Sequence, residues 1–567
     1  MNKKWVIKNR GDNELIQNLA SQLNINPILS NLLIQRGHDT FEKAKEFFRP
    51  SLSMLHDPFL MKDMDKAIER IDKAISENEK ILVYGDYDVD GTTAVALVFT
   101  FFKKRYSQID YYIPDRYKEG YGISNIGIDW AEEEGFGLII ALDCGIKSID
   151  KIEYAKSKGI DFIICDHHRP SSEIPDAVAV LDPKRSDCKY PYKELSGCGV
   201  GFKLIHAYTL SHKIEMSELD DYLDLVAISI AADIVPITGE NRILTYFGLK
   251  RLNSAPRPGI KAILELSGQR GGLTVNDVVF TIAPRINAAG RIESGKQAVQ
   301  LLISDNPDDA MLQGEEINKK NTTRRGLNES MTREALTIIE QDINFKNRKS
   351  TVLYHPEWHK GVIGIVASKL TDEFYRPTVI LTMSNGVASG SARSVKDFDI
   401  YNAIESCSDL LDQFGGHMYA AGLTLKIENI EAFKEKFEAV VSSTIKDHML
   451  IREIEIDDVI SLGDINSSFF NILKQFAPFG PGNMSPVFMS EEVYDRGDMK
   501  IVGNNHLKLS LLQRKSSRIS FDSIAFQLGR HYEQITGNNA FHVCYHVEEN
   551  NFNGRTNLQL NIKDIRY

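Results

Sequence analysis

Residues 80–102 read KILVYGDYDVDGTTAVALVFTFF, and this stretch decides the fold. Residues 81–84 are a short apolar run typical of a buried strand, and the apolar segment after the acidic loop is typical of a buried helix. Thr92 or Thr93 is the expected N-cap of that helix, because a threonine side chain accepts hydrogen bonds from backbone N–H groups of the first turn. A strand that leads directly into a helix predicts the start of a βαβ unit.

Two further strands are expected downstream. Residues 138–142 and 162–165 are short apolar runs, and residues 148–159 between them have the composition of a helix. Strands that alternate with helices predict a parallel α/β sheet covered on both faces.

The second half of the chain indicates other structures. Residues 312–341 read as a long polar helix or helix pair that connects domains, and a second α/β segment follows. The C-terminal region is β-rich and fits a small barrel such as an OB-fold. Its signals are the alternating Leu507, Leu509 and Leu511, the alternating Leu558, Leu560 and Ile562, and the hairpin dipeptide Asn553-Gly554.

The composition is ordinary for a globular protein, with 42% hydrophobic and 26% charged residues. Because no early stretch resembles a signal peptide and no apolar run approaches ~20 residues, we expect a cytoplasmic protein without membrane contact. Six scattered cysteines without a C-x-x-C pair indicate reduced thiols. The net charge of −11 disfavours a nucleic-acid partner at first, yet phosphate binding needs only a local basic surface.

The acidic loop at residues 86–91 reads DYDVDG. Residues two apart in an extended chain point to the same side, so Asp86, Asp88 and Asp90 are expected to face one way, where a divalent cation would remove their repulsion. A solvated acidic turn is the alternative. An EF-hand is disfavoured, because the twelfth position holds Leu97 instead of a glutamate.

The other two predicted strands also end in potential metal ligands. Asp143 follows the second strand, and Asp166, His167 and His168 follow the third. Since ligands of open α/β sheets bind outside the carboxyl ends of the strands, we expect these side chains and the acidic loop along one edge. Mixed carboxylate and imidazole ligands suit Mn²⁺, and all-oxygen sites suit Mg²⁺ or Ca²⁺.

A further ligand is expected from residues 221–236, DYLDLVAISIAADIVP. Asp224 and Asp233 are nine residues apart and would lie on opposite faces of a continuous helix. We favour Asp233 because a carboxylate in an apolar run is costly unless it is paired or metal-bound, which leaves Asp224 a surface or helix-pairing role. Two cations ~3.5–4 Å apart can hold a phosphoryl group and activate water, so the predicted chemistry is metal-assisted phosphoester hydrolysis.

These motifs resemble the DHH phosphoesterase superfamily and, within it, the RecJ family of bacterial single-strand-specific exonucleases. The resemblance extends from about residue 80 to 425, and the β-rich tail looks like the OB-fold of that family. It is carried by VYGDYDVDGTTA, IPDRYKEGYGIS, ALDCGI, CDHHRP, LSGCGVGFKL, LDLVAISIAADIVP, APRINAAGRI, HKGVIGIVASKL, SGSARS and FGGHMYAAG.

The resemblance implies an α/β protein in which a parallel-sheet DHH domain and a second α/β domain, DHHA1, are joined by a long helix and followed by a C-terminal β-barrel. We expect five parts in the 567 residues. They are an N-terminal helical region (1–55), the DHH catalytic domain (56–250), a helical connector (251–343), the DHHA1 substrate-binding domain (344–450) and an OB-fold-like DNA-binding domain (451–567).

The resemblance also implies roles for the candidate ligands. One ion would be held by Asp90, Asp143, His167 and Asp233. The other would be held by Asp88, Asp143 and Asp86, with Asp86 in the place of a histidine common in other branches and Asp143 as the bridge. His168 would contact the scissile phosphate, and Asp166 would orient the motif.

Substrate contacts are implied in the DHHA1 domain, where Ser391 and Arg393 of SGSARS offer donors suited to a phosphate. In the family such a pocket reads the 5′-phosphate end, and Arg116 is expected to join it. Arg285, Asn287, Arg291 and His417 are the other expected contacts, although each arginine could instead form a surface ion pair. Tyr117 and Tyr121 could stack bases or be buried. The connecting-helix cations Lys319, Lys320, Arg324, Arg325 and Arg333 could follow phosphates or form a solvated face.

The implied activity is 5′-to-3′ exonucleolytic hydrolysis of single-stranded DNA with two Mn²⁺ or Mg²⁺ ions, releasing 5′-mononucleotides in DNA recombination and repair. A monomer is expected, and a single-strand-binding protein and a helicase are implied as partners. The polarity rests on resemblance alone. Two alternatives stay open, namely a DHH-family phosphodiesterase for oligonucleotides or cyclic dinucleotides, and a non-catalytic single-strand-binding scaffold.

Overall fold

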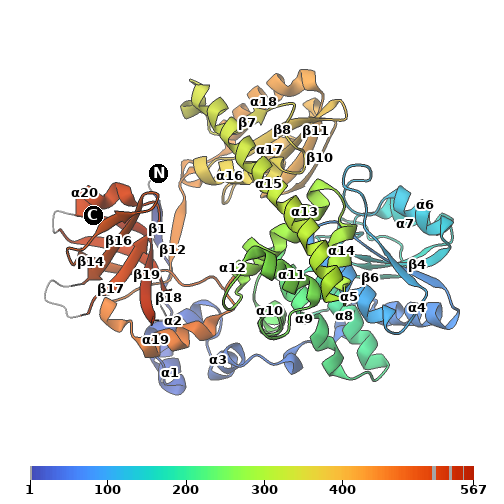
Figure 1. The fold of residues 1–567 in the computed structure, drawn as a ribbon, viewed down its shortest axis with the longest axis horizontal. Helices are drawn as coiled ribbons and strands as arrows, with labels where there is room; N and C mark the ends of the chain where they lie inside the picture. Colours follow the sequence, from blue (N-terminus) through green and yellow to red (C-terminus); the bar gives the residue numbers. More distant parts are fainter. Residues whose placement is uncertain (1–2, 514–518, 536–538, 553–554) are drawn as a thin grey trace. The chain divides into compact units, whose positions relative to one another are not determined.

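A computed structural model describes residues 3–513, 519–535, 539–552 and 555–567 (Figure 1). The described chain forms two compact units. The first unit contains residues 57–233 and 248–452, and the second contains residues 3–56, 234–247 and 453–567. Within the described residues, no helix has both the length and the apolar character that a membrane span requires.

The first unit contains the predicted parallel sheet, with the strand order β3-β2-β4-β5-β6. Its strands are β2 (Lys80–Gly85), β3 (Ile109–Tyr112), β4 (Phe136–Leu142), β5 (Asp161–Cys165) and β6 (Ala179–Leu181). The short strands β3 and β6 add to the three that the sequence predicts. From β2 the chain crosses to β3 on one side, and β4 lies on the other side, so the carboxyl ends of β2 and β4 form a topological switch point where ligands bind.

Helices cover both faces of this sheet (Figure 1). They include α4 (Met64–Ser76), α5 (Val89–Lys103), α6 (Asn125–Glu133), α7 (Ile149–Ser157) and α8 (Gly197–Ser211). The chain continues through α9 (Leu223–Ala232), α10 (Gly239–Ser254), α11 (Pro258–Ser267), α12 (Val275–Asp277), a π-helix (Val278–Ile282), α13 (Ala283–Ile292), α14 (Lys296–Ile303) and α15 (Pro307–Gln341). The stretch predicted as a long helix or helix pair is therefore one continuous helix, α15.

The N-cap of α5 differs from the prediction. Asp88, rather than Thr92 or Thr93, caps this helix, and its side chain accepts a hydrogen bond from the backbone N–H of Gly91 at 3.0 Å. Thr93 instead donates to the carbonyl of Val89. The helix starts inside the acidic loop because carboxylates are favourable beside the positive end of a helix dipole. The loop is consequently not extended, and strand alternation does not explain where its carboxylates point.

The start of α9 is anchored by a buried ion pair. The carboxylate of Asp224 is fully buried, and Arg257 donates to its two oxygens from Nε and Nη2 at 2.7 Å each. Asp224 thus has the helix-pairing role that the sequence left open. Since α9 ends at Ala232, Asp233 follows as the C-terminal capping residue.

The second sheet of the first unit has the order β10-β11-β9-β8-β7, and β7 with β8 is its parallel pair. Its elements are β7 (Thr351–Tyr354), α16 (Ile363–Phe374), β8 (Thr378–Ser384), β9 (Val387–Arg393), α17 (Ile400–Glu405), β10 (Gln413–His417), β11 (Ala420–Leu425) and α18 (Ile430–Thr444). One core joins the end of α15 to α16, and another joins α17 and α18 to the opposite face.

The second unit contains the predicted β-barrel. β14 pairs with both β18 and β16, which closes the ring β14-β18-β19-β17-β16. The alternating Leu507, Leu509 and Leu511 are buried inside it, and the hairpin dipeptide 553–554 lies outside the described residues. The elements are β13 (Asp458–Val459), α19 (Ser467–Leu473), β14 (Phe488–Asp495), β15 (Lys500–Val502), β16 (His506–Leu512), β17 (Phe521–Ala525), α20 (Tyr532–Ile535), β18 (Phe541–Phe552) and β19 (Arg555–Arg566).

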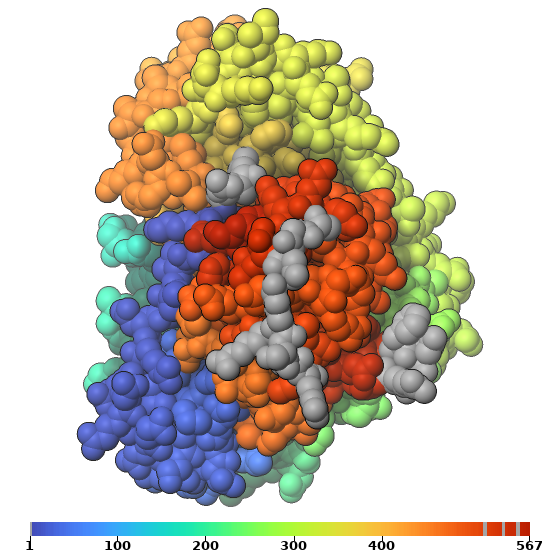
Figure 2. Space-filling model, turned by 90° about the vertical axis from the view of Figure 1, so that its left-hand side faces the viewer, coloured from blue at the N-terminus to red at the C-terminus, as the bar shows by residue number. Residues whose placement is uncertain are grey.

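The N-terminal residues belong to this same unit. β1 (Lys4–Ile7) pairs in parallel with β12 (Glu453–Ile456), and Figure 2 shows the blue N-terminal residues lying against the orange and red C-terminal ones. Leu29, Leu33 and Phe47 share one core with the barrel. Leu29 and Leu33 lie on α2 (Pro27–Gln35) and Phe47 lies on α3 (Phe41–Phe48). Leu19, on α1 (Asn13–Leu23), belongs to the same core. The architecture expected from the sequence is confirmed, and the five domain boundaries stay a prediction.

The Asp224–Arg257 pair predicts a stability effect. Arg257→Ala should lower the free energy of unfolding by about 3 kcal/mol, because it leaves a buried carboxylate without its cation. Denaturant unfolding followed by circular dichroism measures this. Arg348→Ala, which removes a surface pair with Asp342, is the control and should change little. The double variant Arg257→Ala, Asp224→Asn should regain part of the lost stability. Equal free energies of unfolding for Arg257→Ala and Arg348→Ala would contradict the prediction.

Candidate active site

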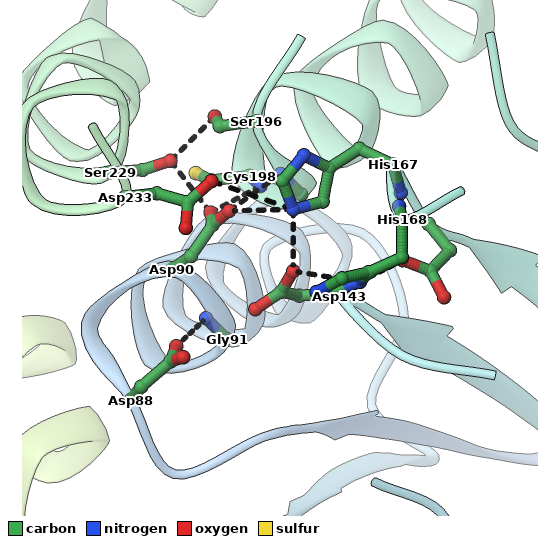
Figure 3. A network of polar contacts seen from close by, with 12 residues as sticks. Asp88, Asp90, Gly91, Asp143, His167, His168, Ser196, Cys198, Ser229 and Asp233 are labelled. Carbon is green, nitrogen blue, oxygen red and sulfur yellow. Dashed lines mark hydrogen bonds and ion pairs between the residues drawn. The ribbon is translucent and has the colours of Figure 1, made fainter. Parts of the chain in front are cut away.

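Three carboxylates converge on one imidazole nitrogen at the carboxyl edge of the first sheet (Figure 3). His167, which follows β5, places Nε2 at 3.2 Å from Oδ1 of Asp143, 3.5 Å from Oδ2 of Asp233 and 3.6 Å from Oδ2 of Asp90. A single nitrogen can donate at most one proton, so it cannot satisfy three carboxylates. The ends of β4 and β5 meet as the sequence predicts, since Asp143 follows the first of these strands and His167 follows the second.

The same side chains form two sets with the spacing of metal ligands. One set is Asp143, His167 and His168, the other is Asp90, His167 and Asp233, and within each set the ligand atoms lie within 4.8 Å of one another. Oδ1 of Asp143 and both ring nitrogens of His167 are buried without a hydrogen bond from any described residue. Burial, followed by the charges of Asp90 and the neighbouring aspartates, raises the pKa of Asp143 well above its usual range. Buried acceptors that lack donors fit a divalent cation.

Asp86 and Asp88 lie beside these sets but do not join them. Asp86 is buried, its Oδ1 accepts from the N–H of Tyr87, and its Oδ2 has no hydrogen bond within the described chain. Burial and then the charge of Asp88 raise the pKa of Asp86, and burial and then the charge of Asp90 raise that of Asp88. The carboxylates of the predicted ligand set, Asp86, Asp88 and Asp143, thus lie near enough to affect one another's pKa. Their oxygens are not close enough together to form one of the two ligand sets.

The amino end of α8 holds Asp90, a feature that the sequence reasoning missed. The N–H groups of Gly197 and Cys198 donate to its two oxygens at 2.7 Å each, and Ser229 Oγ donates to Oδ1 at 2.6 Å. Ser229 in turn contacts Ser196, the N-cap of α8. A glycine-rich stretch that begins a helix is a known anion-binding pattern, so LSGCGVGFKL carried a signal that could have been used.

Gly197 also borders Asp143. A Cβ atom at Gly197 would lie 2.5 Å from Cβ and 2.6 Å from Oδ1 of Asp143, which is too close for any side chain. Asp143 itself has a left-handed backbone conformation, with φ of 59°. Glycine at 197 therefore leaves the space that Asp143 occupies.

His168 forms a pair with Asp166. Its Nδ1 lies 2.7 Å from Oδ1 of Asp166, which also accepts from the backbone N–H groups of His167 and His168. Burial disfavours a charged His168, but the hydrogen bond to Asp166 and the charges of Asp166, Asp233 and Asp90 outweigh it and raise its pKa to about 9. The hydrogen bond to Asp166 thus favours the protonated form of His168, whose side chain is 42% exposed. Asp166 has the orienting geometry expected for it.

The position of Asp233 corrects the reason for choosing it. Its side chain is 31% exposed, whereas the rejected candidate Asp224 is the fully buried one. The apolar run surrounds Asp233 in sequence only, because the chain leaves α9 at that residue and the next residue, Ile234, is exposed. The proximity of Asp233 to His167 and Asp90, and not its burial, supports its choice as a candidate metal ligand.

A group of cations lies on the DHHA1 side of the first unit. Nη1 of Arg393 donates to Ser391 Oγ at 3.1 Å, and a Cβ atom at Gly364 would lie 3.1 Å from Nη2 of Arg393, so this guanidinium lies against the first turn of α16. Arg291 donates to the carbonyl of Gly361 at 3.1 Å, just before that helix.

Arginines from distant parts of the chain meet at Arg291. Burial and then the charges of Arg116, Arg324 and Arg393 lower the pKa of Arg291 to about 10, whereas Asp88 opposes this shift. The guanidinium of Arg116 lies 5.0 Å from the ring centre of Tyr87 in the acidic loop. This concentration of positive charge beside the carboxylates fits an anionic ligand such as a phosphate.

The remaining predicted contacts lie around this group. His417 is exposed at the end of β10, and burial and then Arg393, His168 and Lys147 lower its pKa. Arg285 contacts Thr281 and Asn318, and Asn287 is half-buried on α13. The tyrosines offered as base-stacking candidates, Tyr117 and Tyr121, are both exposed, and the Tyr121 ring lies edge-on to His168 with centroids 6.4 Å apart.

Comparison with known proteins agrees with this site. Residues 80–230 match the DHH family N-terminal domain, residues 347–443 match the DHHA1 domain and residues 456–564 match the RecJ OB domain. The chain is 38% identical to the single-stranded-DNA-specific exonuclease RecJ of Bacillus subtilis (strain 168), over 99% of this chain and 70% of that protein. It is 33% identical to the exonuclease of the same name from Escherichia coli (strain K12), over 95% of this chain and 96% of that protein.

A solved structure shows the same fold. The crystal structure of RecJ in complex with Mn²⁺ from Thermus thermophilus matches with a TM-score of 0.85 at 26% identity, covering 100% of this chain and 79% of that one. Because the sequence matches span nearly all of this chain and most of each relative, the chain belongs to the RecJ family of single-stranded-DNA-specific exonucleases.

Proposed function

We propose that this chain is a metal-dependent exonuclease that hydrolyses single-stranded DNA from its 5′ end and releases 5′-mononucleotides, in DNA recombination and repair. The observation that carries the proposal is the convergence of Asp90, Asp143 and Asp233 on Nε2 of His167, next to a cationic group that includes Arg393. Carboxylates that require a cation and guanidiniums that require an anion, side by side, suit a phosphodiester.

The donors present fit two divalent ions, Mn²⁺ or Mg²⁺. Asp90, Asp143, His167 and Asp233 would hold one ion. Asp143 would be shared with a second ion that Asp88 and Asp86 approach, since the unpaired Oδ2 of Asp86 is buried there. When bound, the ions would supply activation of water at neutral pH and neutralisation of charge on the phosphate oxygens.

The protein groups then bind and orient the substrate. His168, whose Nδ1 is engaged by Asp166, would bind a non-bridging oxygen of the scissile phosphate through Nε2. Ser391, Arg393 and Arg116 would bind a terminal phosphate. A fixed separation between these two phosphate positions would select cleavage of one nucleotide at a time from an end. Arg285, Asn287, Arg291 and His417 would contact the strand or position these groups.

The 5′-to-3′ polarity, the monomeric state, and cooperation with a single-strand-binding protein and a helicase belong to the proposal as family expectations. Two observations disfavour the alternatives. The closed barrel and its match to the RecJ OB domain would be superfluous in a dinucleotide phosphodiesterase. A non-catalytic scaffold has no need for the two gathered ligand sets.

The role of Asp143 can be tested directly. The full chain is incubated with 5′-labelled or 3′-labelled single-stranded DNA, in Mn²⁺ or in chelator, beside Asp143→Asn. We expect immediate release of the 5′ label as a mononucleotide by the unmodified chain in Mn²⁺, and a loss of at least about 100-fold in the variant, because the shared ligand is neutralised. Asp150→Asn, at an exposed aspartate, should behave normally. Activity that persists in chelator, or release of the 3′ label first, would sink the proposal.

The close approach of Gly197 to Asp143 predicts a second effect. Gly197→Ala should lower kcat by about 100-fold, because the new methyl group displaces Asp143, and displacements of roughly 1 Å in an active site cost that much. Gly326→Ala is the matched control, since a Cβ atom there meets no heavy atom within 4 Å, and its kcat should be unchanged. Steady-state kinetics and thermal unfolding are measured together. Unchanged kcat in Gly197→Ala would contradict the prediction.

A further inference from the structure

Phe280 has an apolar side chain that is exposed to solvent. It is 76% exposed, although Val278 and Ile282 on either side of it are fully buried. These three residues belong to the π-helix between α12 and α13. A π-helical turn is rare and occurs frequently at functional sites. The buried neighbours fix the turn, so the exposure of Phe280 is a property of the fold.

Arg285 lies against the turn that carries Phe280. Its Nη1 donates to the carbonyl of Thr281 at 2.7 Å, and its Nε donates to Oδ1 of Asn318, on α15, at 3.0 Å. These two bonds hold the guanidinium between the π-helix and α15. Part of its donor capacity stays available, because a guanidinium has five N–H groups.

Arg324 and Arg325, further along α15, complete a cluster of like charges. Burial and then the charge of Arg325 lower the pKa of Arg285, and burial followed by Arg325 and Arg285 lowers that of Arg324. Nε of Arg324 is buried without a hydrogen bond from any described residue. Within the described ranges, no carboxylate forms an ion pair with any of the three. Like charges that lie near one another repel, and an anion bound among them would relieve this repulsion.

The cluster is continuous with the active site. After burial, the charges of Arg116, Arg324 and Arg393 lower the pKa of Arg291. The charge of the metal-site residue Asp88 raises it. Arg324 therefore lies near enough to both Arg285, beside the turn that carries Phe280, and Arg291, beside the carboxylate site, to affect the pKa of each or be affected by it. A strand whose end is bound at the carboxylate site could follow these arginines.

We propose that Phe280 and the arginines 285, 324 and 325 form a binding site for the uncleaved part of the DNA strand, in which Phe280 stacks on a base and the guanidiniums bind the phosphates. This inference rests on the proposed function and extends it to the strand beyond the scissile bond. Stacking on an exposed ring needs a base with a free face, which an unpaired strand offers and a duplex does not. The site would hold any sequence, because every base has a π-face.

The stacking role predicts a dependence on substrate length. Phe280→Ala should raise KM at least about fivefold for a long oligonucleotide and leave kcat unchanged, since the stacking of one base on the ring is lost. A dinucleotide, too short to reach Phe280, should be cleaved as by the unmodified chain. Phe280→Trp should restore KM, and its indole fluorescence should be quenched by single-stranded DNA. Phe59→Ala, at another exposed phenylalanine of the first unit, is the control and should alter neither parameter.

The phosphate role predicts a change in salt dependence. Arg325→Ala should reduce the slope of log Kd against log salt by about 0.7, the value for one phosphate contact on a single strand. Arg348→Ala, whose arginine is paired with Asp342, should keep the original slope. A KM for long strands that is the same in Phe280→Ala and the unmodified chain, with an unchanged slope in Arg325→Ala, would overturn the inference. If the unmodified chain cleaves no DNA of any length, the proposed function fails instead.

Discussion

The crowding of negative charge around His167 is the constraint on which the rest of the site depends. Three carboxylates meet one nitrogen at 3.2 to 3.6 Å in a buried setting, an arrangement that is unfavourable without a cation. The surrounding fold supplies the rigidity that keeps it. The amino end of α8 and Ser229 hold Asp90, and Asp166 holds His168. The crowded carboxylates destabilise the folded chain, and the elements that carry them must therefore be held by other contacts. The buried ion pair between Asp224, on α9, and Arg257 is one such contact.

The separation of charge explains how an acidic protein can act on DNA. The net charge of −11 describes the whole chain, while the cations that matter are gathered beside the carboxylates. Arg116 lies in the turn after β3, Arg291 lies on α13 and Arg393 lies at the end of β9. Burial and then the charges of the neighbouring arginines lower the pKa of Arg291, and an anionic ligand would stabilise its charged form. Positive and negative groups thus lie close together in one unit without neutralising each other.

The sequence by itself determined the architecture and predicted which side chains gather at one edge of the first sheet. Short apolar strands followed by acidic or histidine residues place ligands at the carboxyl edge of a parallel sheet, because the geometry of β2, β4 and β5 is local and their pairing is parallel. Asp143, His167 and His168 could be assigned in this way, and alternating leucines such as Leu509 located the barrel. These inferences succeed because a regular parallel sheet brings the carboxyl ends of its strands to one edge, whatever the length of the connections.

Only the tertiary structure decided the contacts made across the chain. The N-cap at Asp88, the hydrogen bonds from α8 to Asp90 and the exposure of Asp233 depend on which elements pack together, as does the association of the N-terminal helices with the barrel. An apolar run in sequence does not show where a helix ends. The expectation that Asp233 would be buried was therefore wrong. Phe280 lies in an apolar stretch of the sequence, and a π-helical turn exposes it. The acidic stretch at residues 86–91 therefore indicated a metal site, and packing set the position of each oxygen.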